Sequence, residues 1–85
     1  MSESRKTIYT IEWNQYASGY WDAFFWEHLE GTPFYHGFKI EKTAPQKLRV
    51  NVLADLKRRL LSAGYKAEDV DGATVVEPKE RGQWA

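Results

Sequence analysis

Histidine and carboxylate side chains are the groups in this chain that could hold a metal ion. The only histidines are His28 and His36, and they do not form an HExxH pair. His28 falls within an apolar stretch, where a hydrogen-bonded core histidine is more common than a metal ligand. Asp69-Val70-Asp71-Gly72 resembles the start of a calcium loop but lacks the closing glutamate, so we interpret it as a turn. We expect no metal and no cofactor.

The sequence shows no pairing of a nucleophile with a base. Asp22, Glu27 and Glu30 have the spacing of solvated carboxylates on a helix surface. Ser18 and Ser62 have no histidine at a recognised motif spacing. The chain also has no cysteine and no glycine-rich phosphate loop. We therefore expect a protein that is not an enzyme, with a small ferredoxin-like enzyme as an alternative.

The length and composition predict one small domain. The chain has 85 residues, among them 4 Trp, 5 Tyr and 4 Phe. Aromatic side chains bury about 150–250 Å² each and can fill a small core without disulfides. The sequence has no signal-peptide pattern at its start and no apolar run of membrane-spanning length. We expect a single domain over residues 1–85, with a core at 6–78, a loose tail at 79–85 and a cytoplasmic location.

The aromatic segment between Ser18 and Gly31 is predicted to be the first helix. Ser18 is a suitable N-cap, Gly31 is a suitable residue just past a helix end, and Pro33 follows. On such a helix Trp26 falls opposite the other large apolar side chains. We interpret it as an exposed contact residue, because Trp and Arg are enriched in binding hot spots. The residues predicted to contact a partner protein are Trp26, Asp22, Glu30, Arg58, Arg59 and Trp84.

The segment from Thr43 to Gly64 has two interpretations, one long helix or a turn, a strand and a helix. One helix would place Arg49 inside the apolar stripe, whereas residues 47–52 alternate with a period of two. We therefore predict a strand there and a helix over 53–63, with Asn51 as a possible N-cap. Similar alternation predicts the other strands, and the full set is 7–13, 34–42, 47–52 and 73–77.

The resulting order is strand, helix, strand, strand, helix, strand. This is the ferredoxin-like βαββαβ arrangement, an α+β fold with an antiparallel four-stranded sheet and two helices on one face. The other sheet face must then be solvated, dimerised or covered by a partner. A homodimer through this open face is one expected outcome.

Charge is unevenly distributed along a chain whose net charge is zero. Residues 39–66 carry eight basic and two acidic side chains, and the two flanks are acidic. A basic centre is typical of a polyanion-binding surface but also of ordinary charge balance. The candidate nucleic-acid contacts on the open sheet face are Tyr35, Lys39, Lys47 and Arg49.

The sequence thus favours a small protein-binding module that acts as an inhibitor or adaptor, of the kind that phages encode against host systems. Its most favoured partner is another protein. A nucleic-acid-binding accessory protein is the alternative, and neither hypothesis involves a membrane.

Overall fold

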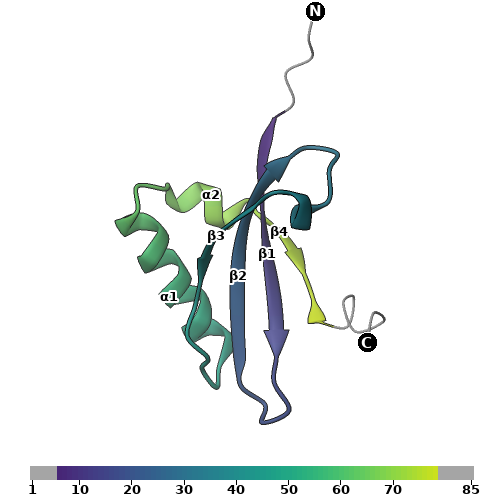
Figure 1. Ribbon diagram of the computed structural model, residues 1–85. Helices are drawn as coiled ribbons and strands as arrows, with labels where there is room; N and C mark the ends of the chain where they lie inside the picture. The colour runs from purple at the N-terminus through teal and green to yellow at the C-terminus, as the bar shows by residue number, and fades with distance from the viewer. Residues whose placement is uncertain (1–5, 79–85) are drawn as a thin grey trace, which may run out of the picture.

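The computed structural model describes residues 6–78 of the chain. Three strands come first, two helices follow, and a short strand ends the described chain (Figure 1). The elements are β1 Thr7–Gln15, β2 Trp21–Leu29, the 3-10 turn η1 Phe34–His36, β3 Phe38–Lys42, α1 Arg49–Ser62, α2 Ala67–Asp71 and β4 Thr74–Val76.

The four strands form one mixed sheet in the order β3-β2-β1-β4. β1, β2 and β3 are joined as an antiparallel meander, and β4 then pairs with the other side of β1 in the parallel direction. The prediction of an α+β fold with a four-stranded sheet and two helices is confirmed. The predicted ferredoxin-like order is wrong, because both helices come after β3 and before β4 in the sequence. The predicted purely antiparallel sheet is wrong, because β4 is parallel to β1.

The predicted helix over 18–31 is wrong, since its centre is strand β2. Gly19 and Gly31 have φ angles of +93° and +87°, which glycine adopts without a Cβ penalty. These two glycines therefore belong to the turns at either end of β2. Ala23 and Phe25 are fully buried, and Trp26 projects to the opposite face of the sheet.

The predicted strand over 47–52 is also wrong. Helix α1 begins at Arg49 and follows an extended N-cap residue, Leu48, so Asn51 is not the cap. The helix over 53–63 is confirmed as the later part of α1. Instead of forming a hairpin turn, the residues before α1 return to β2, where Gln46 pairs with Trp21.

The other predicted strands differ less. The strand over 34–42 is shortened to Phe38–Lys42, because its first residues form η1. The strand over 73–77 is confirmed as β4, and the acidic turn before it is the short helix α2.

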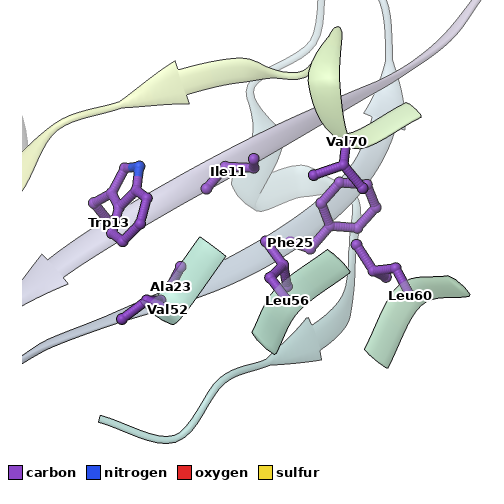
Figure 2. Packing of buried hydrophobic residues seen from close by; sticks show 8 residues of the cluster. All are labelled: Ile11, Trp13, Ala23, Phe25, Val52, Leu56, Leu60 and Val70. Atoms are coloured by element: carbon purple, nitrogen blue, oxygen red, sulfur yellow. The ribbon is translucent and has the colours of Figure 1, made fainter. Parts of the chain in front are cut away.

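The hydrophobic core lies between the sheet and the two helices. Odd-numbered residues of β1 and β2 face the helices, as the alternation in β1 predicts. Phe25 lies near the centre and stacks on Tyr9 with 5.1 Å between ring centroids. Figure 2 shows side chains of both helices converging on Phe25. The buried apolar residues are Ile11, Trp13, Ala23, Phe25, Val52, Leu56, Leu60 and Val70.

The connection between β2 and β3, residues 30–37, folds over part of the other sheet face. The carbonyl oxygen of Thr32 accepts a hydrogen bond from His28 Nδ1 at 3.0 Å, and the Phe34 ring lies edge-on to Trp26. This connection covers the region around His28 and does not extend over the sheet nearer the β1–β2 turn.

Candidate functional site

A groove of about 520 Å³ runs between α1 and β4 on the helix side of the sheet. We call it the α1–β4 groove. Its floor includes Ile11 and Trp13 of β1, and its walls carry Val50 and Val75, whose exposed fractions are 67% and 48%. The complete lining is Ile11, Trp13, Arg49, Val50, Leu53, Val70, Asp71, Ala73, Val75 and Glu77.

The groove exists because α1 covers only part of the sheet. α1 packs on β2 and β3, whereas the short helix α2 packs on β1. Neighbouring helices lie about 8–10 Å apart, which is about two strand spacings of roughly 4.8 Å. One full-length helix therefore covers about two strands, and the β1–β4 half of this face has no such helix (Figure 1).

An ion pair connects each flank of β4 to α1. Glu77, just after β4, pairs with Arg49 at 2.8 Å, and Asp71, before β4, pairs with Lys57 at 2.9 Å. Exposed ion pairs contribute little stability on their own. Here they link the two walls of the groove on either side of β4.

Arg49 has the most extensive contacts of the groove residues. Its guanidinium lies 4.2 Å from the Trp13 ring centroid and 4.7 Å from that of Trp21. Two of its nitrogens donate to the Glu77 carboxylate at 2.9 and 2.8 Å. A planar guanidinium can stack on rings and bind a carboxylate through two nitrogens at the same time. Arg49 thus closes one end of the groove.

Buried polar groups occupy the opposite sheet face. Thr10 Oγ1 and His28 Nε2 are 2.7 Å apart. His28 Nδ1 donates to a carbonyl oxygen, so in the neutral ring Nε2 accepts from the threonine hydroxyl. Next to this pair, the indole N–H of Trp26 donates to Glu12 Oε1 at 2.9 Å. His28 is therefore a hydrogen-bonded structural histidine.

Asp22 lies on the same face and is only 1% exposed. The Tyr16 hydroxyl donates to its Oδ2 at 2.5 Å, while Oδ1 is buried without a hydrogen-bond partner among residues 6–78. The hydrogen bond to Asp22, together with burial and the carboxylate charge, raises the pKa of Tyr16 above its ordinary value.

The predicted protein contacts do not form one surface. Asp22 and half-buried Trp26 lie on the sheet face away from the helices. Arg58 and Arg59 belong to α1, where both pair with buried Asp55 and Arg59 also reaches Glu41 at 3.8 Å. Among the other predicted contacts, Glu30 is exposed in the turn after β2, and Trp84 lies outside the described residues.

The predicted nucleic-acid contacts are also divided. Lys39 is on β3 and exposed, Lys47 is exposed just before α1, and Tyr35 is exposed in η1. Arg49 lies on the opposite side of the sheet, in the groove. The prediction placed Arg49 on the open sheet face as part of a third strand, whereas Arg49 is the first residue of helix α1.

Sequence reasoning missed the groove residues Val50 and Val75. The signal for Val50 was present, because it falls outside the buried stripe of Val52, Leu56 and Leu60 once α1 is drawn as one helix. Val75 gave no comparable signal, since an apolar residue in a short strand is ordinarily part of the core.

Comparison with protein-family models, curated proteins and solved structures finds no match for this chain. Within residues 6–78, no three side chains of His, Cys, Asp or Glu are placed so that they could hold a metal ion. No helix in that same range is both long enough and apolar enough to cross a membrane.

Proposed function

We propose that this protein is a small non-enzymatic binding module whose α1–β4 groove receives an amphipathic helix of a partner protein. The observation that carries the proposal is the exposure of Val50 and Val75 above an apolar floor. Apolar grooves rimmed by charged residues are typical of peptide-binding sites. An inhibitor or an adaptor acts by binding its partner and needs no catalytic group, so we propose one of these two roles for the protein.

A helix fits the groove better than an added strand does. Helix α1 packs on β2 and β3, and within residues 6–78 only the short helix α2 packs on β1, so the groove beside α1 is wide enough for one more helix. Within residues 6–78, β4 is the last strand of the sheet and spans only three residues, Thr74–Val76, so an added strand would gain few backbone hydrogen bonds. An apolar stripe with residues three and four positions apart would contact Val50, Leu53 and Val75 together.

The test compares two variants that each place a carboxylate at an exposed apolar position of α1. Val50→Glu puts it in the groove, and Leu61→Glu, at a residue 51% exposed, puts it outside. Val50 lies in the first turn of α1, where a negative charge favours the helix, so Val50→Glu should stay folded. Each tagged variant is used to capture proteins from the native host, with circular dichroism as the folding control.

We expect a protein that the wild type and Leu61→Glu both retain and that Val50→Glu loses, with affinity reduced about 30-fold, as at a hot spot. Equal retention by Val50→Glu, or no retained protein with any variant, would overturn the proposal. A photo-crosslinking residue at position 75 then reports the partner's conformation. Crosslinks three or four residues apart indicate a helix, and a spacing of two indicates strand addition at β4 and contradicts the helix.

A further inference from the structure

Positive charge without a carboxylate partner gathers on the sheet face opposite the groove. On α1, each of Arg49, Lys57, Arg58 and Arg59 forms an ion pair. Lys39, Lys42 and Lys47 form no ion pair within residues 6–78, and all three are exposed. The positive charge on α1 is therefore paired with carboxylates, whereas the three lysines on the other side of the sheet remain available to a ligand.

These three lysines lie over aromatic rings. The ammonium groups of Lys39 and Lys42 are 4.9 and 5.7 Å from the Phe24 ring centroid, and that of Lys47 is 6.0 Å from the Tyr20 ring. Both rings are partly exposed. Tyr20 and Phe24 are four residues apart along the β2 segment, a distance of about 13 Å in extended chain.

Carboxylates on the same face are directed into the sheet. Glu12 and Asp22 are both buried, and they accept hydrogen bonds from Trp26 and Tyr16 respectively. Among residues 6–78, the groups that the structure places beside the partly exposed Phe24 ring thus include the ammonium groups of Lys39 and Lys42. Rings flanked by cations are the combination with which proteins bind single-stranded nucleic acid, because bases stack on the rings and phosphates bind the cations.

From this arrangement we infer that the β2–β3 side of the open face is a binding surface for single-stranded nucleic acid. On binding, the ammonium groups of Lys39, Lys42 and Lys47 move from the rings to phosphates, and the ring faces of Phe24 and Tyr20 then stack bases. The 30–37 connection covers the next part of β2, around Trp26 and His28, so the surface accommodates a short stretch of strand. This inference is independent of the protein-binding groove, which lies on the other side of the sheet.

The test is fluorescence anisotropy with labelled oligo-dT and oligo-rU over a series of salt concentrations. The slope of log affinity against log salt is about −0.7 per phosphate contacted in a single strand. Changing Lys39, Lys42 and Lys47 to Gln removes three phosphate contacts and should therefore reduce the magnitude of this slope by about 2. Lys57→Gln, which removes a cation paired with Asp71 on the helix side, should leave the slope unchanged.

Stacking is tested separately from charge. Phe24→Leu should weaken binding about tenfold, the effect of losing one stacked base. Phe38→Leu removes a ring that is 74% exposed and outside this surface, and it should have no effect. The inference is overturned by no binding at low salt, by equal affinity for duplex DNA, or by polyglutamate binding that matches oligo-dT. The last result would assign the surface to acidic protein segments.

Discussion

The guanidinium of Arg49 lies 4.2 Å from the centroid of the Trp13 ring, so the first residue of α1 is stacked on the sheet. Trp21 provides a second ring and Glu77 a carboxylate. The contacts join β1, β2, α1 and the residue after β4 at one point. This cluster fixes the position of the helix N-terminus relative to both strands.

Replacing Arg49 should destabilise the fold measurably. Arg49→Ala loses two ring contacts and a two-nitrogen ion pair, and we expect a decrease of about 2 kcal/mol in the free energy of unfolding. Arg49→Lys should lose about half as much, since an ammonium cannot reproduce the planar contact. Urea unfolding followed by circular dichroism measures both. Arg58→Ala is the control at a more exposed arginine, and because Asp55 keeps Arg59 as its partner, we expect a loss of about 0.5 kcal/mol or less.

Phe25 should be the residue least tolerant of truncation. It is fully buried and contacts Tyr9 and Tyr65, so Phe25→Ala should cost about 3–5 kcal/mol of unfolding free energy. Phe38→Ala, at an exposed phenylalanine, should cost well under 1 kcal/mol. Similar costs for the two, measured by denaturant unfolding, would contradict the core assignment.

Tyr16 should make stability depend on pH in the alkaline range. Its pKa in the folded state is raised above 10.0, chiefly by the hydrogen bond to Asp22. That contribution is fully present below pH 10 and is lost as pH rises through the folded-state value. The difference in melting temperature between wild type and Tyr16→Phe should therefore be constant below pH 10 and shrink above it. Tyr9 titrates in both proteins, so its effect cancels, and a difference that stays constant above pH 10 would contradict the prediction.

Gly37 should not accept a side chain. A Cβ there would lie 2.1 Å from the Glu27 carbonyl oxygen and 2.6 Å from His28 Cβ. Gly37→Ala should displace the 30–37 connection and cost about 1–3 kcal/mol. Gly72→Ala, whose Cβ would come no closer than 3.2 Å to its nearest neighbour, is the milder control. NMR chemical shifts of His28 should move in the first variant and not in the second.

The error over residues 18–31 has a physical cause. An amphipathic strand is recognised by polar residues on alternate positions, but β2 carries Phe24, Trp26 and His28 on the face opposite its core residues. That face is partly covered by the 30–37 connection and so admits aromatic residues. Without visible alternation, the turn signals around Gly31 resemble the boundary of a helix.

The error over residues 47–52 has a different cause. From sequence alone, a continuous helix is disfavoured because it places Arg49 among apolar residues. Arg49 does lie among apolar rings, but stacking on Trp13 and the carboxylate of Glu77 compensate its charge. The alternation of Leu48, Val50 and Val52 does not mark the buried face of a strand, because of these three residues only Val52 is buried. β1 was predictable from sequence, since its core and polar faces alternate.

The parallel pairing of β4 with β1 also bears on how the chain folds. Thr10 pairs with Thr74, close to opposite ends of the described chain, whereas the β1–β2 hairpin joins near neighbours. Local pairings form fastest, and distant ones incur the loop-closure entropy first. During synthesis, β1 therefore keeps an unpaired edge until residues 74–76 emerge from the ribosome. For that interval its run of β-branched and aromatic residues can pair with another nascent chain, and the completion of β4 ends this vulnerability to aggregation.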